Sequence, residues 1–189
     1  MSIVLASASP RRAELLKQLG LNFIVLPADI NESVSPDEQE IDYVQRMAES
    51  KAKVVRQSRP ASDIVVAADT TVCIDGKILG KPKNQADCLE MLACLSGRIH
   101  MVYTAVVVSQ LDFIGSALST SEVSFREISQ AEALKYWQTG EPKDKAGSYA
   151  IQGKGAVFVT KLSGSYTGVV GLPLFELSQL LRETDVSLF

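Results

Sequence analysis

The sequence is poor in the residues that build several common kinds of site. It holds a single histidine, His100, which excludes a multi-histidine metal centre and argues against a serine–histidine–aspartate triad. Its three cysteines form neither a disulfide framework nor a zinc-binding spacing. No apolar run approaches the roughly 20 residues of a membrane-spanning helix. Walker A and GxGxxG motifs are also missing, so any phosphate chemistry here needs a different scaffold.

Charge is neither abundant nor one-sided. The 189 residues are 46% hydrophobic and 22% charged, with a formal net charge of −3, which fits one globular domain over residues 1–189. A general nucleic-acid binder normally carries a basic excess, so we expect no nucleic acid as partner, and the lack of a long apolar run leads us to expect no membrane partner. The first residues show no basic stretch followed by an apolar run, and we expect a cytoplasmic protein. Basic residues cluster locally at 11–12, 51–53 and 81–83, which suits a small polyanionic ligand.

The most informative segment lies near the start. Residues 3–5 predict a short apolar strand, and Ser9 and Pro10 are suited to the N-cap and first position of a helix that follows. Arg11 and Arg12 then fall in the first turn of that helix, and Gly20 would end it. Helix N-termini and arginines both bind phosphate oxygens, so the segment predicts a phosphate site. Taken alone, it is equally compatible with an ordinary capped helix and two solvated arginines.

Hydrophobic periodicity and turn residues predict an α/β fold in which helices flank a mixed central β-sheet. Strands and helices alternate in the first half, and antiparallel features follow. We expect strands at 23–27, 64–68, 72–74, 77–79, 99–110, 114–126, 149–151 and 157–162, and helices at 41–57, 84–95, 129–140 and from 173 onward.

Asp69 directly follows the apolar run 64–68, which predicts an acid at the carboxyl end of a buried strand. Ligands of open α/β sheets gather at such ends. An aspartate there could bind Mg²⁺ or act as a general base. The alternative is a turn aspartate satisfied by backbone N–H groups.

Other polar residues carry weaker signals. Lys81 lies in a Gly- and Pro-containing loop that could meet a phosphate or simply be solvated. Lys51 and Lys53 are two apart on a helix, so at most one can face a site. Glu32 lies in an acidic loop, where a lone glutamate is usually solvated. Gln152 lies between glycines and could read a base edge, because its amide both donates and accepts hydrogen bonds.

Taken together, these segments resemble the Maf family, nucleoside triphosphate pyrophosphatases that are also linked to inhibition of septum formation. The matching motifs run in order along the chain: SASPRR (7–12), ESKA (49–52), ADT (68–70), GKP (80–82), SG (96–97), DKAG (144–147), IQG (151–153) and VGLPL (170–174). The resemblance implies a fold like that of inosine triphosphate pyrophosphatases, with a cleft between two lobes, and a homodimer.

The resemblance also implies roles for single residues. Asp69 would be the catalytic acid–base residue. Glu32 and Asp69 would bind a divalent cation, Mg²⁺ or Mn²⁺. The side chains that contact the nucleoside triphosphate substrate would be Ser9, Arg11, Arg12, Lys51, Thr70, Lys81 and Gln152.

Three positions separate the branches of the family. The branch that hydrolyses 7-methyl-GTP has Trp, Gln and Glu where this chain has Arg11, Thr70 and Gln152, which match the dTTP/UTP branch. The resemblance therefore implies a hydrolase that converts dTTP and UTP to the nucleoside monophosphate and pyrophosphate. The alternatives are a pyrophosphatase for modified or other nucleotides, such as 7-methyl-GTP, and a nucleotide-sensing regulator of cell division.

Overall fold

The computed structural model describes residues 1–188, in which strands and helices alternate through the first half of the chain. The strands are β1 (Ile3–Leu5), β2 (Phe23–Val25), β3 (Ile64–Ile74), β4 (Lys77–Leu79), β5 (Ile99–Gln110), β6 (Phe113–Phe125) and β7 (Val159–Ser163). The α-helices are α1 (Pro10–Gln18), α2 (Glu40–Gln57), α3 (Gln85–Leu95), α4 (Gln130–Gln138), α5 (Tyr166–Val170) and α6 (Leu174–Leu181). Short 3₁₀ turns cover Glu141–Asp144, Ala146–Ser148 and Lys154–Phe158. None of the helices in residues 1–188 is long and apolar enough to cross a membrane.

One mixed sheet forms the centre of the molecule. Its strand order is β2-β1-β3-β5-β6-β7, and β4 pairs with β3 off this path. β1 is parallel to β2 and β3, whereas β3, β5, β6 and β7 pair antiparallel. The mixed α/β class expected from the sequence is confirmed.

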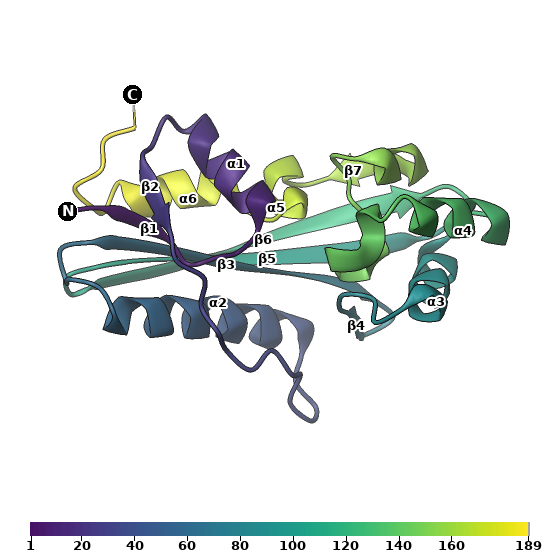
Figure 1. The fold of residues 1–189 in the computed structure, drawn as a ribbon, viewed down its shortest axis with the longest axis horizontal. Helices are drawn as coiled ribbons and strands as arrows, with labels where there is room; N and C mark the ends of the chain where they lie inside the picture. Colours follow the sequence, from purple (N-terminus) through teal and green to yellow (C-terminus); the bar gives the residue numbers. More distant parts are fainter. Residues whose placement is uncertain (189) are drawn as a thin grey trace.

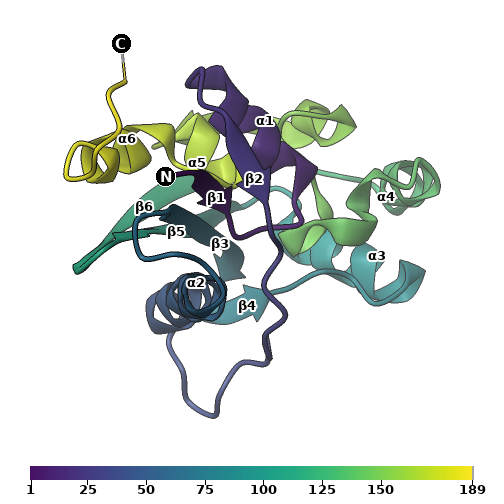
Figure 2. The same ribbon diagram turned by 60° about the vertical axis from the view of Figure 1, so that its left-hand side comes forward.

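Helices cover both faces of this sheet. α2 packs on one face, where Val44 and Ala48 meet Val65 and Ala105. α1 and α6 pack on the other face (Figures 1 and 2). A third apolar cluster lies further along β3 and β5, where α3 and α4 cover the sheet. The long strands therefore join two halves of the molecule, with separate apolar clusters on either side of the middle of β3.

The helix ends and the hairpin follow the local sequence signals. Asn84 accepts a hydrogen bond from the Asp87 N–H at the start of α3, and Ser129 and Glu132 form the expected capping box of α4. Gly20 follows α1 with φ of 71°, the left-handed conformation that glycine adopts without a steric cost. β5 and β6 pair along their whole length, as expected.

Two predictions of secondary structure are wrong, and a third strand begins later than predicted. β3 is one strand from Ile64 to Ile74, so Asp69 lies in its middle and not at its carboxyl end. β5 pairs with β3 residue by residue, and Asp69 lies opposite Ala105. The segment 149–151, predicted as a strand, is irregular, and the strand that pairs with β6 is β7. The strand predicted at 157–162 begins only at Val159, after a 3₁₀ turn.

His100 is buried in the apolar cluster beneath α3 and α4. Its residue is 1% exposed, its Nε2 lies 2.9 Å from the Tyr149 hydroxyl, and its ring packs edge-on against Phe125. Burial lowers the pKa of His100 to about 4, because the charged imidazolium would lose its hydration. His100 is therefore a neutral core residue at physiological pH.

This burial predicts a pH-dependent stability. Between pH 6.5 and 4 the unfolded chain protonates His100 and the folded chain does not, so the free energy of unfolding should fall as the pH falls through that window. The loss attributable to His100 should approach about 3 kcal/mol at pH 4, with no contribution above pH 6.5. Urea unfolding of wild type and His100→Gln across this range measures the difference in slope. Parallel stability curves for the two proteins would contradict the assignment.

Candidate active site

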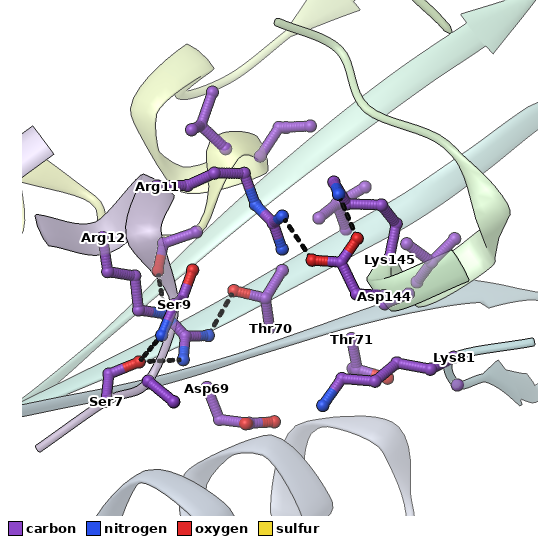
Figure 3. A pocket seen from close by; sticks show the side chains of 18 of the residues that line it. Ser7, Ser9, Arg11, Arg12, Asp69, Thr70, Thr71, Lys81, Asp144 and Lys145 are labelled. Carbon is purple, nitrogen blue, oxygen red and sulfur yellow. Dashed lines mark hydrogen bonds and ion pairs between the residues drawn. The ribbon is translucent and has the colours of Figure 1, made fainter. Parts of the chain in front are cut away.

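A cavity of about 540 Å³ lies between the two halves of the molecule, over the middle of β3. Every candidate residue from the sequence lines it: Ser9, Arg11, Arg12, Glu32, Lys51, Asp69, Thr70, Lys81 and Gln152. These residues come from segments up to 143 positions apart, as Figure 3 shows for many of them. The structure thus brings the whole predicted set together, although the roles of its members remain proposals.

The place of the cavity follows from the unequal lengths of two parallel strands. β1 ends at Leu5, which pairs with Val66, whereas β3 continues for eight residues beyond that point. The turn after β1 therefore passes beside the part of β3 that has no β1 partner, at Asp69 and Thr70. The site still lies at a carboxyl strand end, as expected for an open α/β sheet, but the strand that ends there is β1.

Arg12 is fixed by neutral partners. Its Nε donates to the Gly171 carbonyl at 2.7 Å, and its two terminal nitrogens donate to the Ser7 and Thr70 hydroxyls at 3.2 Å each (Figure 3). Burial lowers the pKa of the Arg12 guanidinium, and the nearby Asp69 carboxylate opposes that shift. Arginine nevertheless stays protonated in proteins, so the cavity contains a positioned cation that has no hydrogen-bonded carboxylate among residues 1–188.

The turn before α1 differs from the expected helix cap. Ser9 occupies the N-cap position and Pro10 the first helical position, but the Ser9 side chain makes no capping hydrogen bond. The Ser9 N–H instead donates to the Ser7 hydroxyl at 3.1 Å. Since Ser9 lines the cavity, its hydroxyl is available to a ligand there.

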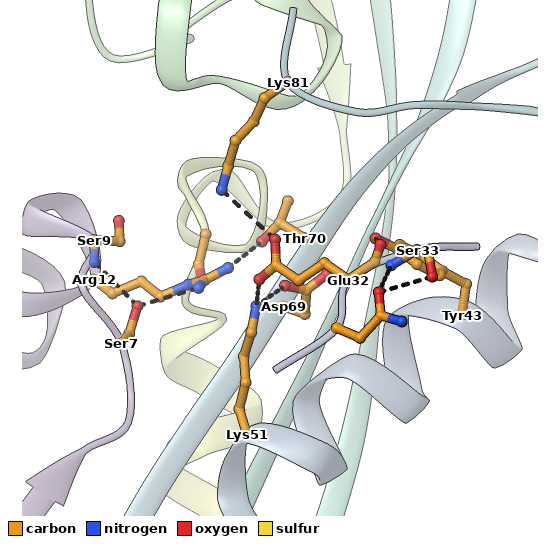
Figure 4. A network of polar contacts seen from close by, with 12 residues as sticks. Ser7, Ser9, Arg12, Glu32, Ser33, Tyr43, Lys51, Asp69, Thr70 and Lys81 are labelled. Carbon is orange, nitrogen blue, oxygen red and sulfur yellow. Dashed lines mark hydrogen bonds and ion pairs between the residues drawn. The ribbon is translucent and has the colours of Figure 1, made fainter. Parts of the chain in front are cut away.

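Lys51 lies between two carboxylates. Its Nζ is 2.6 Å from Asp69 Oδ1 and 2.6 Å from Glu32 Oε1 (Figure 4). The Lys51 side chain is 10% exposed, whereas Lys53 points to solvent, so only one of the two lysines faces the site, as their spacing predicts. One oxygen of Asp69 and one oxygen of Glu32 therefore contact the same Lys51 ammonium group.

Glu32 belongs to the irregular loop between β2 and α2, and its side chain is 45% exposed. Partial burial acts to raise its pKa, but the hydrogen bond and charge of Lys51, helped by Lys81 and Arg12, lower the pKa below its ordinary value. Lys81 approaches the other Glu32 oxygen at 3.8 Å. Glu32 is therefore ionised and oriented, unlike the solvated loop glutamate that its sequence context suggests.

On the far side of the cavity, ion pairs connect the two halves of the molecule. Arg11, on α1, donates to Asp144 Oδ2 at 3.0 Å, and Lys145 pairs with the other oxygen of that carboxylate (Figure 3). Burial acts to raise the pKa of Asp144, but its bonds to Lys145 and Arg11 lower the pKa overall. Gln152 is exposed on the same side, next to the apolar wall that includes Ile151.

Among the cavity residues that were not singled out from the sequence, three ionisable side chains have polar contacts with the predicted residues or with one another. Asp144 and Lys145 lie in the DKAG motif, which signalled the segment but not their contacts. Tyr43 precedes Lys51 by eight residues on α2, a spacing that places two side chains on similar faces of a helix. That spacing is the sequence signal that could have indicated that Tyr43 lies near the cavity.

A divalent cation has only a partial protein site here. Among residues 1–188, no group of three histidine, cysteine, aspartate or glutamate side chains could hold a metal ion. Glu32 and Asp69 provide two carboxylates, each with one oxygen not bonded to Lys51. Mg²⁺ is typically held by one or two carboxylates together with waters and substrate phosphates, so this donor set fits such an ion when a nucleotide accompanies it.

The model of the Maf family, described as "Maf-like protein", matches residues 2–184. The chain belongs to the Maf family. A dTTP/UTP pyrophosphatase of Methylobacillus flagellatus is 51% identical over 98% of this chain and 94% of its own length. One of Pseudoalteromonas atlantica is 49% identical over 98% of both chains. This Maf protein therefore spans nearly the full length of these relatives.

Solved structures show weaker likenesses to this Maf protein. The Ham1 protein of Staphylococcus aureus is 18% identical, with a TM-score of 0.47 over 69% of this chain and 73% of that one. A nucleoside-triphosphatase, dITP/XTP pyrophosphatase, from Mycobacterium abscessus is 16% identical, with a TM-score of 0.42 over 66% and 73% of the two chains.

Proposed function

We propose that this Maf protein hydrolyses dTTP and UTP to the nucleoside monophosphate and pyrophosphate. The observation that carries the proposal is the arrangement of Arg12, Lys51 and Asp69 in one cavity. In this arrangement Arg12 is a fixed cation that can bind phosphate, and Lys51 holds the Asp69 carboxylate near it. The relatives that are about half identical to the chain over nearly its full length bear the name of this activity.

The charges of the cavity suit a triphosphate. Its described lining has five cationic side chains and three carboxylates: Arg11, Arg12, Lys51, Lys81 and Lys145, and Glu32, Asp69 and Asp144. Each carboxylate is already in contact with a lysine or arginine, whereas Arg12 bonds only neutral groups. We assign Arg12, Lys81 and Ser9 to the phosphates, where fixed donors stabilise the charge that develops during hydrolysis.

Asp69 is the candidate for activating water. In the proposed reaction, water attacks the α-phosphorus, the bond to the β-phosphate oxygen breaks, and pyrophosphate leaves. Asp69 would orient the water and accept its proton, or ligate the metal ion. The hydrogen bond from Lys51 fixes the direction of the Asp69 carboxylate, so its free oxygen is aimed before substrate arrives.

We assign the divalent cation, Mg²⁺ or Mn²⁺, to Glu32 and Asp69. Such an ion neutralises phosphate charge and lowers the pKa of a bound water. Lys51 keeps the two carboxylates within reach of one ammonium and therefore close to each other. The remaining coordination positions would be filled by water and by phosphate oxygens.

The activity itself is tested by product analysis. Purified protein is incubated with Mg²⁺ and a panel of ribo- and deoxyribonucleoside triphosphates that includes 7-methyl-GTP, and pyrophosphate and phosphate are measured separately. We expect pyrophosphate and monophosphate from dTTP and UTP. Release of single phosphates, or a preference for 7-methyl-GTP, would overturn the proposal.

Base preference should depend on Arg11, Thr70 and Gln152. The Gln152 amide can both donate and accept, as a uracil or thymine edge requires, whereas an ionised glutamate only accepts and suits the donors of a guanine edge. The triple variant Arg11→Trp, Thr70→Gln, Gln152→Glu should therefore lower kcat/KM for dTTP and UTP and raise it for 7-methyl-GTP. An unchanged ranking of the three substrates, in a variant that still folds and turns over, would exclude these positions as the determinants.

We further propose that the protein acts in the cytoplasm as a homodimer, without nucleic acid or membrane as partner. The dimer follows from the family resemblance, and the modest negative charge supports the absence of nucleic acid. Light scattering after size-exclusion chromatography measures the mass in solution, and a mass near the 20.4 kDa of one chain would reject the dimer.

A further inference from the structure

The loop that carries Glu32 has no regular secondary structure of its own. It runs from residue 26 to residue 39, between β2 and α2, and descends beside α2 (Figure 2). Residues 31–37 are exposed. Hydrogen bonds within the loop, such as those of Ser33 to Asn31, shape it locally, but its position relative to the sheet depends on its contacts with other elements, so those contacts decide where the Glu32 carboxylate lies.

Two side chains of α2 form hydrogen bonds with the backbone of this loop at and next to Glu32. The Tyr43 hydroxyl donates to the backbone carbonyl of Glu32 at 3.0 Å, and Arg46 donates to the carbonyl of Ser33 at 3.0 Å. Figure 4 shows Tyr43 and Lys51 on opposite sides of Glu32. The loop is thus tied to α2 at two successive backbone carbonyls, on the residue that enters the cavity and on the one after it.

Arg46 is itself fixed. Its Nε and Nη2 donate to the two oxygens of Glu38 at 2.5 and 2.6 Å, and its guanidinium lies 5.6 Å from the centre of the Tyr43 ring. The hydrogen bond from Arg46, with one from the Ser35 N–H, lowers the pKa of Glu38 to about 2. A bidentate arginine–carboxylate pair is rigid, because two parallel bonds set its orientation as well as its distance.

The same helix also provides the partner of the Glu32 carboxylate. Lys51 bonds Glu32 Oε1 and Asp69 Oδ1, so α2 holds Glu32 by its backbone and by its side chain at once. From these contacts we infer that Tyr43 and Arg46 are positioning residues, which hold the Glu32 carboxylate opposite Asp69 and thereby set the affinity of the site for a divalent cation. The inference rests on the proposed function, because it assigns these residues to the metal and phosphate site proposed above.

A double-mutant cycle separates this role from a merely structural one. Tyr43→Phe removes only the hydroxyl, and a lost hydrogen bond of this kind should weaken Mn²⁺ binding about 3- to 10-fold. We expect a similar fall in kcat at low metal concentration, with the nucleotide KM changed less than about twofold. In a Glu32→Gln background, Tyr43→Phe should have no further effect, because the group through which it acts is gone.

Mn²⁺ binding is measured directly, by the electron paramagnetic resonance signal of free Mn²⁺, with and without a nucleotide whose α–β bond resists hydrolysis. Arg46→Ala should weaken binding as Tyr43→Phe does, and Arg46→Lys should restore it only in part, since lysine cannot form the fork. Arg98→Ala is the matched control, because Arg98 also grips a single carboxylate, Asp75, at 2.7 Å to each oxygen, away from the cavity. Thermal unfolding checks that every variant folds. If Arg46→Ala does not fold, the Mn²⁺ affinity of Tyr43→Phe alone tests the inference.

The outcomes differ for the inference and for the function beneath it. Unchanged Mn²⁺ affinity in Tyr43→Phe, in a protein where Glu32→Gln weakens binding, overturns the positioning role. An equal loss from Tyr43→Phe with and without Glu32 overturns it too, because the tyrosine would then act by another route. A wild-type protein that binds Mn²⁺ but releases no pyrophosphate from any nucleotide overturns the proposed function and leaves the binding test of the loop intact.

Discussion

Replacing Asp69 by asparagine should reduce hydrolysis of dTTP and UTP by about 10²–10⁴-fold, the usual effect of removing a general base, while nucleotide binding remains close to that of wild type. The Asp69 side chain is 13% exposed and its Oδ1 accepts a hydrogen bond from Lys51. Asparagine has nearly the same shape, and the backbone of this position stays paired with Ala105 in the sheet. The substitution therefore removes the proton acceptor while Glu32 still pairs with Lys51, and thermal unfolding checks that the variant is folded.

Single-turnover hydrolysis and equilibrium binding of a nucleotide that resists hydrolysis measure the two effects separately. Asp144→Asn is the matched control, because Asp144 is a cavity carboxylate that also contacts cations, Arg11 and Lys145, but does not contact Lys51. Its effect on kcat should be much smaller than that of Asp69→Asn. If Asp69→Asn kept more than about a fifth of wild-type turnover, a general base costing 10²-fold or more could not lie at this position.

Replacing Arg12 by alanine should lower kcat/KM by about 10²–10³-fold, the range found when one preorganised donor to a developing charge is removed. The factor should be the same for every nucleotide that the enzyme accepts. The reason is that Arg12 is aimed by three neutral acceptors, on Ser7, Thr70 and Gly171, which leaves its charge for the ligand. Arg12→Lys should rescue little, because an ammonium group cannot keep the planar fork of bonds.

Lys81→Ala provides the comparison. The Lys81 side chain is 64% exposed, so its loss should also be uniform across nucleotides but smaller than that of Arg12. The Arg12→Ala variant also leaves the Gly171 carbonyl without its partner, and thermal unfolding must show that the chain remains folded at the assay temperature. A loss confined to one base would place Arg12 in base recognition and contradict its assignment to the phosphates.

Local chemistry explains the part of the fold that the sequence determined by itself. The capping box of Ser129 and Glu132, the Asn84 cap and the left-handed Gly20 each depend on residues within a few positions of one another. The β5–β6 hairpin likewise follows from two β-rich runs around a short turn. The motif residues of the cavity were identifiable for another reason, since family resemblance marks residue types at fixed places without any knowledge of their contacts.

Only the tertiary structure decided where those residues lie and what they touch. The apolar run ends at Ala68, yet β3 continues to Ile74. The reason is that β5 pairs with nearly the whole of β3, from Ser109 opposite Val65 to Met101 opposite Cys73. The sequence could not show this, since the partner strand is more than 25 residues away. The apolar residues 149–151 form no strand, and the strand that pairs with β6 is β7, so apolar character alone did not decide which segment joins the sheet.

Glu32 shows the same division within the site. Its neighbours in the chain are polar and exposed, and by themselves they indicate a solvated loop. Its actual surroundings are Lys51, Lys81 and Tyr43, which come from α2 and from the loop after β4 and meet Glu32 only when the sheet has brought those elements together. The sequence determined which chemical groups are available. The packing of α2 against the sheet decided that one lysine would contact two carboxylates, because contacts between distant segments leave no periodic pattern in the sequence.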